Sequence, residues 1–189
     1  MVDSKDQKFE GDLFKKYFKL QTTGGFIAVR KWLEGGKLSV DIGELAASGG
    51  LVNNTLIWTP VIPFATYLRS ITNNTADRLY SATKQNGPES FIHYGGGNTS
   101  DGPISRLFKV AHWYNDDTGN SFEFKTGHFK ATQSATGAFV PDMSKVISVN
   151  KIKVLRSEIA EMSYVVDLAL QSFAGSDNWL SCINGKEKS

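Results

Sequence analysis

The chain has 189 residues, of which 40% are hydrophobic and 12% aromatic, with 21 basic against 19 acidic side chains and a single cysteine. A chain of this length buries well over half of its unfolded surface, and its apolar content is too high for an intrinsically disordered protein. No run of apolar residues approaches the ~20 that a membrane span requires, and the lone Cys182 excludes an internal disulfide framework. A net charge of +2 excludes a histone-like polycation but allows a local basic face.

The N-terminal residues are polar and charged. MVDSKDQKFEGD lacks the apolar run of ~7 to 15 residues that follows the basic end of a secretory signal. We therefore expect a cytoplasmic or other reducing intracellular compartment, with neither secretion nor membrane association. On that expectation, the Asn-x-Ser/Thr triplets at Asn53, Asn73 and Asn98 are chance occurrences and not glycosylation sites.

The first half of the chain shows the two-residue alternation that is typical of half-buried strands. The predicted strands are residues 13–20, 26–33, 37–44 and 54–59, with a hairpin turn at 34–36. Thr59 followed by Pro60 resembles an N-cap with proline at the first helical position, and apolar residues then recur at helical spacing. These signals predict four strands followed by a helix that ends or kinks at Asn73.

The second half repeats this order. The predicted strands are residues 91–97, 106–115, 121–131 and 145–150, with a turn at 116–119 and a long loop rich in Thr, Ser and Ala before the fourth strand. From Ile152 to Phe173, apolar residues step by three or four and predict an amphipathic helix over 151–173. Asn150 is placed to cap the start of this helix, and Gly175 lies just beyond its end.

Two copies of four strands and a helix form an internal structural repeat. The predicted fold class is α+β, with two tandem ββββα repeats whose antiparallel sheets carry the helices on one face. The predicted domain covers residues 13–174, with repeats at about 13–85 and 90–174. A polar tail, 1–12, precedes it, and a C-terminal tail, 175–189, follows it.

Each predicted sheet has one face without a helix, and polar residues are expected there unless the face has a function. Here that face carries aromatic rings beside cations. Sequence-tolerant binding of single-stranded nucleic acid requires this pairing, because a base stacked on a ring contributes ~1 to 3 kcal/mol and every linkage carries a charge. The candidate contacts are Lys15, Tyr17, Lys19, Arg30, Trp32 and Lys37 in the first repeat, and Lys109, Trp113, Phe124, Lys125, His128, Phe129 and Lys130 in the second. The competing interpretation places the aromatics in the core, and Lys15 and Lys19 on a solvated strand face.

The order of these segments resembles the DNA-binding domain of the transcriptional coactivator positive cofactor four. The resemblance is carried by FIAVRKW, the turn EGGK, LSVDIGE, a glycine-containing loop, and LIWTP entering a helix. Tandem duplication of this unit in one chain resembles the Whirly proteins of plants and the related mitochondrial RNA-binding proteins of trypanosomatids. The similarity covers roughly residues 13–174 and rests on order and spacing.

The resemblance implies a sheet surface that binds single-stranded nucleic acid, DNA in preference to RNA, in transcription, replication or recombination. It also implies that the helices form the core and the interface of a homo-oligomer, a dimer or tetramer. By position, Trp32 matches the aromatic at the first hairpin, and Lys37 the lysine after its turn. Gly43 and Ala46 stand where the coactivators have Arg and Trp, and the lysine-glycine-lysine signature of Whirly proteins is absent. Binding is therefore expected to depend mainly on the second repeat.

Other constellations do not support catalysis. The Asp-Thr-Gly triplet at 117–119 occurs once and predicts a hairpin turn, whereas an aspartic protease needs two carboxylates. His93, His112 and His128 lack the spacing of metal ligands, and the glycines at 95–97 predict a flexible connection and not a phosphate loop. We therefore expect a non-enzymatic protein without cofactor or metal. Two other functions stay open: a protein-interaction or assembly scaffold, and a virion or carbohydrate-binding β-sandwich.

Overall fold

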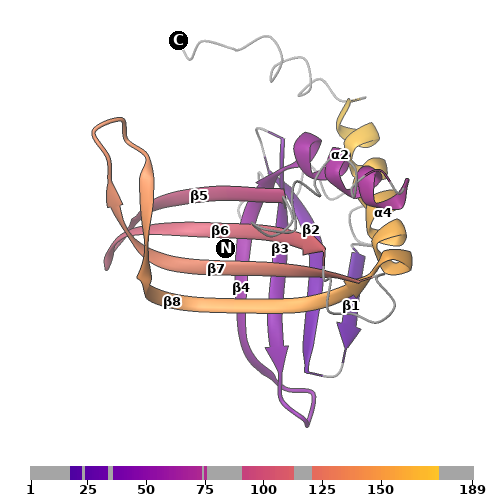
Figure 1. The fold of residues 1–189 in the computed structure, drawn as a ribbon, viewed down its shortest axis with the longest axis horizontal. Coiled ribbons are helices and arrows are strands. Elements are labelled where there is room, and N and C mark those ends of the chain that lie inside the picture. Colours follow the sequence, from indigo (N-terminus) through magenta and orange to yellow (C-terminus); the bar gives the residue numbers. More distant parts are fainter. Residues whose placement is uncertain are drawn as a thin grey trace, which may run out of the picture.

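The computed structural model describes residues 18–22, 24–33, 36–73, 75, 91–112 and 121–174. These residues form two four-stranded antiparallel sheets, each followed by a helix (Figure 1). Sheet A contains β1 (Phe18–Thr22), β2 (Gly25–Leu33), β3 (Lys37–Leu45) and β4 (Leu51–Pro60) in that order, and α2 (Val61–Thr72) follows it. Sheet B contains β5 (Phe91–Thr99), β6 (Gly102–His112), β7 (Ser121–Gln133) and β8 (Phe139–Leu155), and α4 (Arg156–Ala174) follows it. The predicted α+β fold with two ββββα repeats is confirmed, and the β-sandwich alternative is excluded because both helices follow their fourth strands.

The first repeat follows its predicted elements closely. The second, third and fourth predicted strands coincide with β2, β3 and β4, although β4 already begins at Leu51. Pro60 is the N-cap of α2, in extended conformation (φ −61°, ψ 128°), and not its first helical residue. The helix ends at Thr72 with Asn73 as its C-cap, as predicted. Residues 13–17 of the first predicted strand lie outside the described part of the chain.

The second repeat contains longer strands than the sequence predicted. The prediction of a long loop before the fourth strand is wrong, because β7 continues to Gln133 and β8 already starts at Phe139. A tight turn, in which Gly137 has a φ of +82°, connects the two strands. The strand predicted at 91–97 is confirmed as β5, and the flexible connection predicted for the glycines at 95–97 is therefore wrong. The candidate turn at 116–119 lies outside the described residues.

The start of the last helix also differs from its prediction. The strand β8 runs on to Leu155, so α4 begins at Arg156 and the predicted start at Lys151 is wrong. The apolar residues before this point alternate with lysines, and that pattern fits a strand as well as the first turn of an apolar stripe. Asn150 therefore caps no helix; its side-chain amide donates to Oγ1 of Thr55 in the other repeat (2.6 Å).

The two sheets cross, and the two helices pack against each other beside the crossing (Figure 1). The edge strand of sheet A, β4, contacts all four strands of sheet B. At the far end of sheet B, the β7–β8 hairpin bends back until Phe139 of β8 packs on Gly96 of β5, where it leaves no room for a Cβ. In Figure 1, the strands of sheet B run on past β4 on the side away from the helices, so this half of sheet B projects beyond sheet A.

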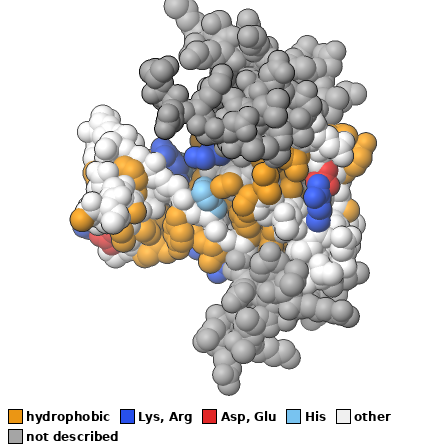
Figure 2. Space-filling view, turned by 90° about the horizontal axis from the view of Figure 1, so that it is seen from above, with side chains coloured by type: hydrophobic (Ala, Val, Ile, Leu, Met, Phe, Trp, Pro, Cys, Tyr) orange, Lys and Arg blue, Asp and Glu red, His pale blue; other side chains and the backbone are white. Residues whose placement is uncertain are grey.

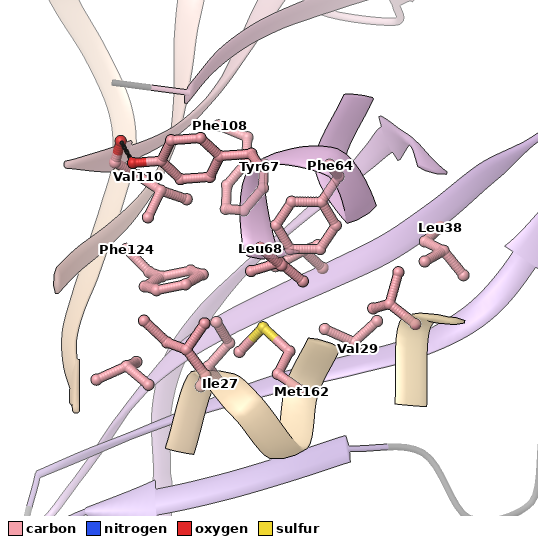
Figure 3. Close-up of a cluster of buried hydrophobic side chains, with 14 of the residues drawn as sticks. Ile27, Val29, Leu38, Phe64, Tyr67, Leu68, Phe108, Val110, Phe124 and Met162 are labelled. Carbon is pink, nitrogen blue, oxygen red and sulfur yellow. Dashed lines mark hydrogen bonds between the residues drawn. The ribbon is translucent and has the colours of Figure 1, made fainter. Parts of the chain in front are cut away.

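The two repeats share one hydrophobic core, which lies between the helices and the inner faces of both sheets (Figure 3). The ring of Phe64 in α2 meets Phe108 of β6 edge-on at 5.3 Å between centroids. In the same region, the Tyr67 hydroxyl donates to the carbonyl of Val110 (3.3 Å). Neither repeat forms this core alone, because residues of one repeat fill the inner surface of the other.

Polar contacts also join the repeats through their helices. Arg69 of α2 and Asp167 of α4 form an ion pair at 2.7 Å, which raises the pKa of Arg69. Arg156, at the start of α4, donates to the carbonyl of Ile71 (2.6 Å) and lies over the Phe122 ring. None of the described helices is long and apolar enough to cross a membrane.

Candidate nucleic-acid interface

Strand register assigns every side chain of sheet B to one of two faces, because directly opposed residues in an antiparallel pair share a face. The inner face carries Phe108 and Phe124, which are fully buried against the helices. The outer face carries Ile92 and Tyr94 of β5, each about half exposed. The outer face is thus the predicted helix-free face of the second repeat.

A row of three lysines crosses this outer face. Lys109 of β6 is directly opposite Lys125 of β7, which is directly opposite Lys151 of β8. On β5, the row continues with Ile92, which is opposite Lys109. Tyr94, 50% exposed, lies on the same face one step along β5, within reach of a long lysine side chain. We call Lys109, Lys125 and Lys151 the lysine row.

The lysine row opposes folding. Like charges directly opposite each other on a sheet are destabilising, and opposite charges are the stable arrangement. Lys151 is near one carboxylate, that of Glu123 at 3.7 Å, and no described carboxylate pairs with Lys109 or Lys125. An arrangement that costs stability and is only partly compensated, here by Glu123 beside Lys151, is typical of a functional site. Binding of a polyanion would remove this repulsion.

A second basic region lies on the inner face, in the half of sheet B that projects beyond β4. Alternation along β4 buries Ile57 in the core and turns Leu56, 38% exposed, to the opposite side. Beyond this strand, the inner face of sheet B continues to the far end of β6 and β7. We call this region the corner; it comprises Leu56 and Trp58 of β4, Gly95 and Gly97 of β5, Arg106 of β6, and His128 and Lys130 of β7.

Two histidines attach the free edge of β4 to sheet B in the corner. His128 Nε2 donates to the carbonyl of Leu56 (3.1 Å), and His93 forms a hydrogen bond with the backbone of Trp58. Burial lowers the pKa of His128; the bond to Leu56 opposes this shift, and the charge of Arg106 adds to it. Burial likewise lowers the pKa of His93. Both imidazoles are therefore neutral near pH 7.

The permanent positive charge of the corner comes from Arg106 and Lys130. No described carboxylate forms an ion pair with either side chain, and Lys130 uses one of its donors on the backbone carbonyl of Asp101 (2.9 Å). Figure 2 shows a histidine side chain next to Lys and Arg side chains, with hydrophobic side chains beside them. The corner thus combines cations with an apolar border.

Two of the predicted contacts in the second repeat are wrong. Phe124 has no exposed surface and lies in the core, where its ring centroid is 6.3 Å from that of Phe108. Phe129 lies on the outer face, but it is only 4% exposed and its ring covers Gly127. Neither ring can stack on a base in this structure. The sequence pattern could not separate them from surface rings, because both faces of β7 alternate cations with aromatics.

The remaining predicted contacts divide between the two surfaces and the parts of the chain that are not described. Lys109 and Lys125 lie in the lysine row, His128 and Lys130 in the corner, and Lys37 is exposed at the start of β3, where it lowers the pKa of His93. Lys15, Tyr17 and Trp113 lie outside the described residues, and so do the side chains of Lys19, Arg30 and Trp32.

Sheet A offers less surface for binding. On the face of β2 and β3 opposite the core, Ala28 and Ser39 are buried, and Asp41 accepts a hydrogen bond from Asn54 (2.9 Å). The Phe26 ring covers Gly43 and leaves no room for a Cβ at this position. That the first repeat has lost a contact at Gly43 stays a prediction.

Sequence reasoning missed four candidate contacts. Tyr94 was visible as a polar-tipped aromatic two residues after Ile92, on the same face of the predicted strand. Lys151 was assigned to the last helix, which in the structure starts only at Arg156. Arg106 and Trp58 carried no signal, because only the crossing of the two sheets brings β4 to the histidines that lie beside them: the Trp58 backbone bonds to His93, and the charge of Arg106 acts on His128.

The sequence matches no protein-family model and no curated protein. The structure is similar to that of WHY3 from Arabidopsis thaliana, with a TM-score of 0.53 and 12% sequence identity over 90% of this chain and 95% of that chain. It is also similar to WHY1 from Arabidopsis thaliana, with a TM-score of 0.52 and 12% identity over 92% of this chain and 97% of that chain. The chain therefore has a Whirly-like fold, as its sequence resemblance predicted.

Proposed function

We propose that this protein binds single-stranded nucleic acid, without enzymatic activity, through the outer face of sheet B. The lysine row carries the proposal: three opposed lysines, of which Lys151 is exposed and the other two partly exposed, are unfavourable for folding and suited to consecutive phosphates. Tyr94 supplies an exposed ring beside them for base stacking. A lysine contacts phosphate as a point charge, and a ring accepts any base, so binding is expected to be sequence-tolerant.

The Whirly-like fold is consistent with this function. The sequence resemblance to the coactivator and Whirly families implies binding of single strands, with DNA preferred to RNA, in transcription, replication or recombination. The scaffold alternative accounts less well for the lysine row, because an interaction surface needs no row of like charges in which Lys109 and Lys125 have no ion pair with a described carboxylate. We also propose a reducing intracellular compartment, in keeping with the single cysteine.

The test is an electrophoretic shift series with an unstructured DNA strand, the matching RNA and a DNA duplex, each at two salt concentrations. We expect submicromolar binding of the single strands at low salt, weaker binding at high salt because counterions are released, and weaker binding of the duplex. Absence of any shift with both single strands at low salt would overturn the proposal.

We further propose that the protein is a homo-oligomer, a dimer or tetramer. Large hydrophobic side chains remain exposed on both helices, with Ile62 on α2 and Tyr164 on α4, and such residues are candidates for a subunit contact. Sedimentation analysis at micromolar concentration should therefore give a multiple of the chain mass. A mass equal to the 20.8 kDa of one chain would contradict this.

A further inference from the structure

The corner has the chemistry of a second nucleic-acid contact surface. Arg106 and Lys130 provide two cations that no described carboxylate neutralises. Leu56 and Trp58 provide an exposed aliphatic and a half-buried aromatic side chain at the border. Cations beside apolar and aromatic groups suit a single strand, whose bases are unpaired, better than a small anion, which would use the cations alone.

On β5, the corner is lined by two glycines, Gly95 and Gly97, which have no side chains. On the inner face of β5, the nearest neighbour that a Cβ at Gly95 would have among the described residues is Nε2 of His93, at 4.0 Å. A Cβ at Gly97 would lie at ordinary contact distance, 3.7 Å, from Nη1 of Arg106. Glycine within a strand commonly marks a place where another chain or a ligand approaches closely. Here the two glycines leave space among the described side chains, beside the guanidinium group of Arg106.

The corner and the lysine row lie on opposite faces of sheet B but share the edge strand β5. Tyr94 and Ile92 project from its outer face, and the next residue on its inner face is Gly95. Because β5 is the end strand of the sheet, no further described strand pairs with its free edge. A strand bound beside Tyr94 can therefore pass round this edge into the corner.

We propose that the corner binds the same single strand as the outer face, which passes round the edge of β5 so that Arg106 and Lys130 contact additional phosphates. This inference rests on the proposed function and adds a second contact surface to it. Linking two weak contacts through one strand raises affinity through effective concentration. Affinity should therefore increase steeply once an oligonucleotide is long enough to reach both surfaces.

The test measures fluorescence anisotropy with oligothymidylates of about 6 and about 20 nucleotides, a range that spans common site sizes. Gly95→Val fills the corner without changing charge, and valine suits a strand at a position with open space and no positive φ. Arg106→Gln removes charge from the same place. Unchanged binding of the shorter probe, together with the thermal unfolding midpoint, verifies that each variant is folded.

We expect wild-type protein to bind the longer probe at least about tenfold more tightly than the shorter one. Both corner variants should lose most of this gain and retain wild-type binding of the shorter probe, whereas Lys125→Gln should weaken binding of both probes. If the two corner variants keep the full length dependence, the corner makes no contact and the inference is wrong. Failure of wild-type protein to bind either probe would instead overturn the proposed function.

Discussion

Lys125 is the central member of the lysine row, and its substitution should raise stability and lower affinity together. Its two cross-strand neighbours, Lys109 and Lys151, are both cations. Charges about 7 Å apart in water repel by about 0.6 kcal/mol, and roughly half of this remains at 0.1 M salt. Two such neighbours predict that Lys125→Gln increases the free energy of unfolding by about 0.6 kcal/mol at about 0.1 M salt, and by more at lower salt.

The same substitution should weaken binding through the loss of one phosphate contact. Each contact contributes about −0.7 to the slope of log K against log salt for a single strand. If the affinities of the wild-type protein and the variant are equal at about 1 M salt, the affinity of the variant at about 0.1 M is roughly fivefold lower. This corresponds to a loss of about 1 kcal/mol of binding free energy. Urea denaturation and anisotropy titrations, both repeated over a salt series, measure the two effects independently.

The matched control is Lys145→Gln on β8, which changes the net charge of the protein by the same amount as Lys125→Gln. Lys145 is exposed, lies outside the lysine row and pairs with Asp142 at 3.1 Å. This variant should leave the salt slope unchanged and should not stabilise the protein. The reasoning is refuted if Lys125→Gln lowers stability, or if its salt slope equals that of the wild type.

Three further measurements separate stacking, packing and titration. Tyr94→Ala should cost about 1 to 3 kcal/mol of binding free energy without changing the salt slope, because stacking releases no counterions; a reduced slope would contradict this. Phe124→Ala should lower the free energy of unfolding by about 3 to 5 kcal/mol in urea titrations and leave the affinity of the folded protein intact. The pKa values of His93 and His128 are lowered in the folded state, so their contribution to stability is complete above pH of about 6.5 and is lost as the pH falls below it. Thermal unfolding at pH 7.5 and 5 should show this loss, and His128→Gln, which keeps a donor for the β4 carbonyl, should reduce it.

The order of the elements was predictable from the sequence because local alternation and helix signals agree with the fold. The strands β2 and β3 and the end of α2 were predicted to within about two residues. The boundary between β8 and α4 was not, because Lys151 to Leu155 satisfies both periodicities. Tertiary pairing with β7 decides in favour of the strand, and it sets the first residue of the helix.

The candidate site was predictable only in part, for a physical reason. Alternation states which residues of β7 share a face, but not which face meets the helices. Phe124 and Lys125 are consecutive residues of β7, so the alternation predicts that they lie on opposite faces of the sheet. Phe129 shows that even the correct face is insufficient, since packing over Gly127 buries its ring. The corner depends on how two sheets cross, and no local pattern encodes that crossing.

The distribution of charge indicates a division of roles between the two repeats. The four strands of sheet B carry seven basic and two acidic side chains, an excess larger than the +2 of the whole chain. The edge strand of sheet A, β4, is bonded through its backbone to His93 and His128 of sheet B. On the face of sheet A opposite the core, Ala28 and Ser39 are buried. The basic side chains of sheet B lie on its outer face and on the part of its inner face beyond β4, away from the buried aromatic residues of the core. A chain of nearly neutral net charge can in this way present a strongly basic sheet, whose affinity depends on local charge and stacking and not on the total.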